Sequence, residues 1–198
     1  GQALRGYRYS RGWADDQKVY FYAEFSKPFK DFKVIRGDIQ IWQDEFKDMA
    51  AFAHAYFEAE PQERVMMKVA LSPVSMEGAY ANMKVELPGW DFEATAKAAD
   101  QAWNQELGKI KVEGKYKEAL KIFYTALYHA MIAPSTFCDV DGSYRGADGQ
   151  AHENPGYQTY TTFSLWDTYR AAMPLYSIFQ SERYTDMINT MLAIYKEQ

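Results

Sequence analysis

Residues 88–108, with the sequence PGWDFEATAKAADQAWNQELG, mark the point where the hydrophobic pattern of the chain changes. Pro88 and Gly89 interrupt the preceding segment. Asp91 is suited to cap a helix, because its side chain can accept hydrogen bonds from the first free backbone N–H groups. From there to Gly108, which is placed to end the helix, apolar residues recur at the helical period of about 3.6. We therefore predict a helix here, and a boundary near residue 89.

Upstream of this boundary the pattern is that of β-strands and turns. In residues 18–25, KVYFYAEF, the side chains alternate between two faces, which is typical of a half-buried strand. Further strands are predicted at 32–35, 39–42, 50–57 and 64–71. The stretch 50–57 is also rich in alanine, which favours a helix, but its aromatic residues alternate. Several short strands at this spacing predict a β-sandwich.

Downstream the chain is predicted to be helical apart from one long polar loop. A second helix begins near Lys115 and stops at Pro134, a third begins at Ser164 with a kink at Pro174, and a fourth begins at Ser181. The loop at 134–163 is long enough to suggest a functional or disordered segment. Strands followed by helices indicate an α+β, multidomain architecture.

Composition and charge exclude several classes of protein. Hydrophobic residues make up 47% and charged residues 25% of the 198 residues, as in a packed globular protein. The net charge is −5 and no basic cluster is present, so nucleic-acid binding is not expected. No apolar run approaches the ~20 residues of a transmembrane segment. The single cysteine, Cys138, and three histidines argue against a disulfide framework and a histidine-based metal site. Aromatics, at 17%, suit either a bulky core or a surface for sugar faces.

The strongest candidate site is SLWDTYR at 164–170, a helix start directly after the polar loop. Trp166 has a flat face suited to a pyranose ring. Asp167 can accept sugar hydroxyls or help to hold a cation, and Arg170 can orient Asp167 or contact the ligand. The alternative is structural, because Ser164 and Asp167 have the spacing of a capping box.

Weaker candidates lie elsewhere. Asp139 and Asp141 in CDVDGSYR form either a turn or a cation or ligand site, although the calcium-loop pattern is incomplete. Trp13 in GWADDQ belongs either to a turn or to a neighbouring site. His129 is either a partner of the helix dipole or a cavity residue. Cys138 lacks the partners of a nucleophile, and Glu153 is expected to be solvated.

These residues resemble those of the glycoside hydrolase family 92 exo-α-mannosidases. Five stretches carry the resemblance, in the same order: GYRYSRGWADDQKVYFYAEFSKPF at 6–29, KVALSPVSMEGAYANMKVELPGWDF at 68–92, Trp103-Asn104, FYTALYHAMIAPSTFCDVDGSYRG at 123–146 and YTTFSLWDTYRAAMPL at 160–175. The resemblance implies part of an N-terminal β-sandwich at 1–88, a linker helix at 89–114 and the first helices of an (α/α)₆ barrel at 115–198. The chain is accordingly expected to be an internal fragment whose partner is the remainder of its own polypeptide.

The same resemblance implies calcium-dependent, inverting exo-α-1,2-mannosidase activity on mannose-terminated glycans, in a protein exported to the periplasm, cell surface or medium. Inversion needs an acid and a base, which in this family come from later barrel helices; no catalytic residue is therefore assigned, and the calcium ligands stay open. Trp166 and Asp167 match the sugar-pocket motif, with Arg170 as support and the loop of Asp139 and Asp141 at the pocket rim.

Two alternative functions are also considered for this sequence. A disaccharide phosphorylase built on a similar plan would use phosphate in place of water and would need a phosphate pocket. A non-catalytic carbohydrate-binding module would have a complete sandwich with a flat aromatic platform. The change to helices near residue 89 argues against the second of these.

Overall fold

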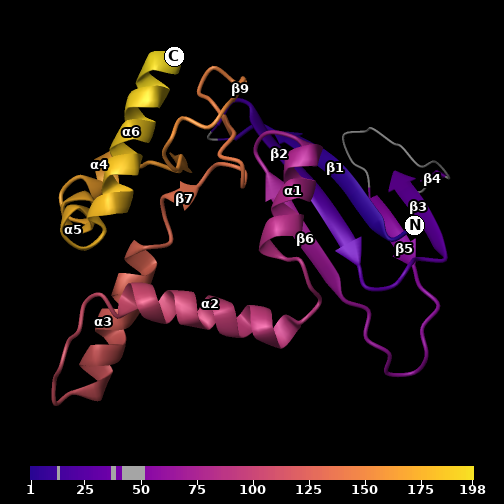
Figure 1. Ribbon diagram of the computed structural model, residues 1–198, viewed down its shortest axis with the longest axis horizontal. Coiled ribbons are helices and arrows are strands. Elements are labelled where there is room, and N and C mark those ends of the chain that lie inside the picture. Colours follow the sequence, from indigo (N-terminus) through magenta and orange to yellow (C-terminus); the bar gives the residue numbers. More distant parts are fainter. Residues whose placement is uncertain (13, 37–38, 42–51) are drawn as a thin grey trace.

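The computed structural model describes residues 1–12, 14–36, 39–41 and 52–198. Trp13, residue 42 of the predicted strand at 39–42, and residues 50 and 51 of the predicted strand at 50–57 lie outside the described residues. Figure 1 shows the sheets and the N-terminus at one end of the molecule and the last helices at the other, with the polar loop and α2 between them.

The first sheet contains three antiparallel strands in the order β1-β2-β6, with bounds β1 Ala3–Ser10, β2 Gln17–Phe25 and β6 Met67–Ser72. The predicted strand at 18–25 is confirmed as β2, the central strand, where Ala23 is buried. The strand predicted at 64–71 begins three residues later than expected, at Met67.

The second sheet has the order β4-β3-β5, also antiparallel, with bounds β3 Asp31–Arg36, β4 Ile39–Ile41 and β5 Phe52–Tyr56. Residues 52–56 of the segment predicted at 50–57 form a strand, so alternation prevailed over the helical preference of alanine. Pairing with β3 supplies the backbone hydrogen bonds that an isolated segment would lack. Antiparallel sheets followed by helices confirm the predicted fold class.

A helix that the sequence analysis missed covers the first sheet. Helix α1, Met76–Glu86, lies within the region predicted to contain only strands and turns. Ser75 caps it, because its hydroxyl accepts a hydrogen bond from the Gly78 N–H at 2.9 Å. Ala79 and Met83 are fully buried in its packing face. The buried face also includes Asn82, so the short helix has no clean apolar stripe to reveal it.

Helices α2, Phe92–Leu107, and α3, Lys117–Ala130, follow as predicted. The Asp91 carboxylate accepts a hydrogen bond from the Ala94 N–H at 2.9 Å, which confirms the cap. The two helices meet at Trp103 and Tyr128, whose ring centroids are 4.6 Å apart. However, α2 buries no residue, and Phe92 at the start of its predicted apolar stripe is 73% exposed.

The polar loop is ordered by short strands. They pair as β7 with β10 and β8 with β9, with bounds β7 Ser135–Thr136, β8 Tyr144–Arg145, β9 Ala151–His152 and β10 Tyr160–Thr161. Arg145 ties the loop to the segment after β6, because its guanidinium donates to the carbonyls of Pro73 at 2.7 Å and Val74 at 3.0 Å. This loop therefore connects the sheets to the C-terminal helices.

The predicted third helix is wrong in detail, because it is two helices. Their bounds are α4 Leu165–Thr168 and α5 Ala172–Phe179, followed by α6 Ser181–Glu197. Pro174 lies in the first turn of α5 and does not kink a longer helix. Proline has no N–H to bond to the preceding turn, and the first turn is where that loss costs least. A small core of Tyr160, Met173, Tyr176 and Met187 holds β10, α5 and α6 together.

Candidate functional site

The turn formed by α4 presents an indole ring and a carboxylate to solvent. Trp166 is 87% exposed and Asp167 is also exposed. Arg170 does not orient Asp167: its Nε donates to the Tyr169 hydroxyl at 2.6 Å, and its guanidinium lies 5.3 Å from the centroid of that ring. An exposed indole ring and an exposed carboxylate on the same turn suit a polyhydroxylated ligand that has one apolar face.

The structure supports only in part the interpretation of Asp167 as a helix-capping residue. Its carboxylate accepts a hydrogen bond from the Ser164 hydroxyl, whereas a capping box would direct it to the Ser164 N–H. Ser164 itself makes no side-chain cap. The carboxylate thus keeps acceptor capacity toward solvent.

Asp139, unlike the exposed Asp167, is buried. It is 6% exposed and joins three elements: Oδ2 accepts from the Ser72 hydroxyl at 2.7 Å, and Oδ1 accepts from the Asn82 amide at 2.8 Å. Burial raises the pKa of Asp139, while the two hydrogen bonds oppose that rise. A β-carbon at Gly78 would lie 2.1 Å from Asp139 Oδ2, so any larger residue there would have to displace the carboxylate. Asp139 is a buried junction between β6, α1 and the loop.

Asp141 lies in a turn. It is exposed, its carboxylate accepts from the Ser143 N–H at 2.9 Å, and Gly142 has the positive φ of 86° that such turns favour. In the part of the chain that the structure describes, no hydrogen bond or ion pair joins Asp139 or Asp141 to Trp166, Asp167 or Arg170. His129 is exposed in the last turn of α3, where a cation favours the helix dipole.

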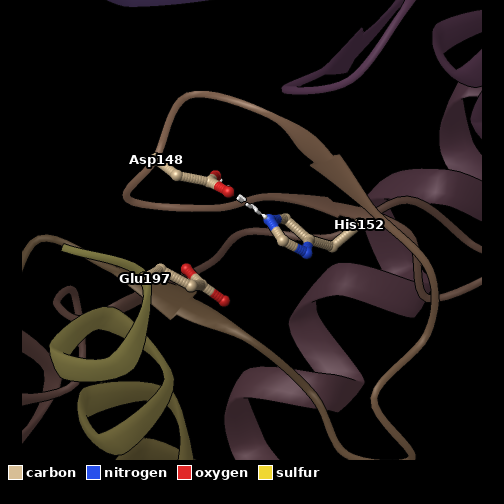
Figure 2. A group of neighbouring side chains, drawn as sticks. All are labelled: Asp148, His152 and Glu197. Carbon is tan, nitrogen blue, oxygen red and sulfur yellow. Dashed lines mark hydrogen bonds and ion pairs between the residues drawn. The ribbon is translucent and has the colours of Figure 1, made fainter.

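A second group of polar side chains was missed by the sequence analysis. Asp148, His152 and Glu197 come together where the loop between β8 and β9 meets the end of α6 (Figure 2). His152 Nε2 lies 3.0 Å from Asp148 Oδ1, and the Tyr144 hydroxyl donates to Glu197 Oε1 at 2.6 Å. Burial and then this hydrogen bond raise the pKa of Tyr144. Glu197 is remote in sequence, so only the fold could reveal the group.

Asp139 and Asp141, for which the sequence left open either a turn or a cation or ligand site, are not part of a larger group of ligands in the described residues. Both Asp139 oxygens accept hydrogen bonds from Ser72 and Asn82, and no third His, Cys, Asp or Glu side chain converges on the two aspartates there. Among the described residues, the group of three His, Cys, Asp or Glu side chains with converging ligand atoms is Asp148, His152 and Glu197. One of these atoms is a ring nitrogen, whereas calcium takes oxygen ligands.

No helix within the described ranges is both long enough and apolar enough to cross a membrane. Cys138, partly buried, is a free thiol.

Comparison with known proteins shows which protein family the chain matches. The model of the glycosyl hydrolase family 92 N-terminal domain matches residues 1–72, and that of the family's catalytic domain matches residues 78–198. A curated relative from Arthroderma benhamiae, described as an uncharacterized secreted glycosidase, is 29% identical over 111 residues, which are 54% of this chain and 13% of that protein.

Solved structures from the same family are similar to this chain. A family GH92 alpha-mannosidase from Bacteroides thetaiotaomicron is similar over 100% of this chain, with 35% identity and a TM-score of 0.89, and it has also been solved in complex with mannoimidazole. A family GH92 inverting mannosidase from the same organism is similar over 100% of the chain, with 27% identity and a TM-score of 0.85. The chain spans only 28% and 27% of the length of these two enzymes.

Proposed function

The chain belongs to glycosyl hydrolase family 92, and from this we propose that it acts within a longer enzyme that removes terminal α-mannose from glycans. The observation that carries the proposal is the similarity of the whole chain to an alpha-mannosidase, at 35% identity and a TM-score of 0.89. The complex of that enzyme with mannoimidazole supports a mannose-like ligand for this chain.

The exposed turn of α4 is the part of the chain that we assign to substrate binding. Trp166 offers its indole face to the CH face of a mannose ring, and Asp167 accepts hydrogen bonds from ring hydroxyls. Arg170 lies against Tyr169 at the end of the same turn and borders the site. The two interactions are complementary, because one recognises an apolar face and the other the polar edge of the same sugar.

The chemistry itself requires groups that we do not assign to this chain. An inverting glycosidase places a general acid and a general base on opposite faces of the sugar, about 6.5–9.5 Å apart. Asp139 is committed to its buried junction, and Asp167 is placed to bind hydroxyls. We propose that the remainder of the polypeptide supplies the acid and the base, and that it also covers exposed apolar residues of α2 and α3 such as Phe92 and Ile122.

The finer features of the activity are proposed together. They are exo-cleavage of α-1,2 linkages, inversion at the anomeric carbon, dependence on calcium, and export to the periplasm, cell surface or medium. The inverting mannosidase and the secreted glycosidase among the similar proteins support inversion and export. Calcium takes oxygen ligands, which we do not assign to particular residues of this chain.

The test is hydrolysis of α-1,2-mannobiose by the longer protein, followed by proton NMR of the first-formed product. We expect β-mannose to appear first, activity to stop with a chelator, and calcium to restore it. α-Mannose as the first product would exclude inversion. Mannose 1-phosphate formed only with added phosphate would indicate a phosphorylase, and binding without release would indicate a carbohydrate-binding module. Either result would overturn the proposal.

A further inference from the structure

We propose that Asp148, His152 and Glu197 bind a divalent first-row transition metal ion, with zinc as the representative ion. The three side chains come from two parts of the chain: the β8–β9 hairpin, with Asp148 in its turn and His152 in β9, and the last turn of α6 (Figure 2). Their ligand atoms all lie within 4.8 Å of one another. This site is separate from the exposed turn of α4 and does not depend on the proposed mannosidase activity.

The three ligand atoms converge beside Gly146. A β-carbon on Gly146 would be 2.6 Å from His152 Nε2, 2.7 Å from Asp148 Oδ1 and 2.7 Å from Glu197 Oε2. This point marks the convergence of the ligand atoms and not the position of the ion, because a β-carbon is only ~1.5 Å from its own Cα. Zinc bonds to nitrogen and oxygen are ~2.0–2.2 Å, so ligand atoms within 4.8 Å of one another can reach one ion that lies farther from the backbone.

A dissolved ion can reach these side chains. The side chains of Asp148 and His152 are each 33% exposed, and Glu197 is partly exposed. Each carboxylate oxygen that faces the point also accepts a backbone hydrogen bond at 2.9 Å, from Gln150 N to Asp148 Oδ1 and from Ala147 N to Glu197 Oε2. These bonds orient the two carboxylates. His152 Nε2 also lies within hydrogen-bond distance of both Asp148 oxygens, at 3.0 and 3.1 Å, and a bound ion would replace that contact.

The donor set selects the kind of metal. One imidazole nitrogen and two carboxylate oxygens suit zinc and its first-row neighbours, with water completing the coordination. Calcium is disfavoured by the ring nitrogen. The Tyr144 ring stacks on His152 with centroids 5.2 Å apart and its hydroxyl binds Glu197, so it holds two of the three ligands. A bound ion would fasten the β8–β9 turn to α6.

The first experiment is a zinc titration of metal-free protein by calorimetry, in a Cys138→Ser background that removes the free thiol. We expect one zinc ion per chain and weaker binding of calcium. His152→Phe keeps a ring against Tyr144 but removes the nitrogen, and Glu197→Gln removes a charge. Loss of an outer-shell group typically costs 10–100-fold in metal affinity, so loss of a ligand should cost at least tenfold. The matched controls, His129→Phe and Glu153→Gln, should bind zinc as the parent does.

A further variant tests the convergence of the three ligand atoms while keeping every ligand. Gly146→Ala places a methyl group 2.6–2.7 Å from all three ligand atoms, so it should push them apart and weaken zinc binding at least tenfold. Gly89→Ala, where a β-carbon meets no atom within 4 Å, should not. Equal zinc affinity in the His152, Glu197 and Gly146 variants and in the controls would overturn the site.

A measurement on the unmutated ligands covers the case in which a variant fails to fold. The chain has three histidines, His54, His129 and His152. Zinc should shift the imidazole NMR signals of His152 and leave those of His54 and His129 in place. A response from either of the other two, without His152, would show that zinc binds elsewhere and would overturn the proposal.

Discussion

Asp139 and Asp167 are two aspartates that the sequence places at candidate binding positions, and the fold gives them opposite environments. Asp139 is 6% exposed, and each of its oxygens accepts a hydrogen bond from another part of the chain. Asp167 is exposed, and its described side-chain partner is the hydroxyl of Ser164 on the same turn. A carboxylate whose oxygens are filled by the protein holds the fold together, whereas one open to solvent can bind a ligand.

The comparison also separates two parts of the molecule. The Asp139 junction connects β6, α1 and the polar loop, and so fixes the first sheet against the loop. The turn of α4 lies after that loop in the chain and buries no residue. Damage to the first should therefore appear as lost stability, and damage to the second as lost substrate binding.

The largest expected effect concerns hydrolysis by the isolated chain. Neither aspartate is assigned as a general acid or base, and each such group commonly contributes about 10²–10⁴-fold to a rate. Purified residues 1–198 should therefore release no mannose from α-mannobiosides above a blank, with or without calcium. Turnover above the blank would show that this chain contains an acid–base pair. It would contradict the assignment of Asp139 to stability and of Asp167 to substrate binding.

Asp167→Asn should reduce kcat/KM of the longer enzyme about 10- to 150-fold, because a hydrogen bond to a charged group is worth roughly 1.5–3 kcal/mol. The amide still accepts from the Ser164 hydroxyl, so the melting temperature should not change. Steady-state kinetics on α-1,2-mannobiose and a thermal melt provide the two readings. Activity within twofold of the parent enzyme would remove Asp167 from the binding site.

Asp139→Asn should lower the free energy of unfolding by about 1–3 kcal/mol. The amide places an NH₂ group against either the Asn82 amide, also a donor, or the Ser72 oxygen. That oxygen already accepts from the N–H groups of Val74 at 2.9 Å and Ser75 at 3.1 Å. Urea denaturation measures the change. The matched control, Asp141→Asn, lies in an exposed turn and should stay within about 0.5 kcal/mol of the parent.

The smallest effect is expected for Gly78→Ala, at about 1 kcal/mol of destabilisation. Alanine favours a helix over glycine by up to about 1 kcal/mol, but overpacking costs about 1–3 kcal/mol. Here the new β-carbon would lie 2.1 Å from Asp139 Oδ2 and 2.8 Å from Ser72 Oγ. Gly89→Ala is the control without a clash. A stabilised Gly78→Ala protein would show that the junction is looser than its hydrogen bonds indicate.

The local sequence pattern predicted an element correctly where that element has a regular hydrophobic period or a capping residue. The alternation at 18–25 predicted β2, and Asp91 and Gly108 predicted the two ends of α2. The local sequence pattern failed where packing against residues distant in the sequence decides the structure. Helix α1 buries Asn82 as well as Ala79 and Met83, so it lacks the apolar stripe that would announce it. Pro174 indicated a disturbance, but the separation of α4 from α5 was not foreseen.

The sequence by itself determined the order of strands before helices, the candidate turn at Trp166 and Asp167, and the resemblance to the family to which the chain belongs, because these depend on local pattern and ordered motifs. Only the tertiary structure decided which carboxylates are available. Burial and hydrogen-bond partners come from residues far apart in the chain: Ser72 and Asn82 enclose Asp139, and Glu197 reaches Asp148 and His152. Spacing along the sequence carries no record of such contacts.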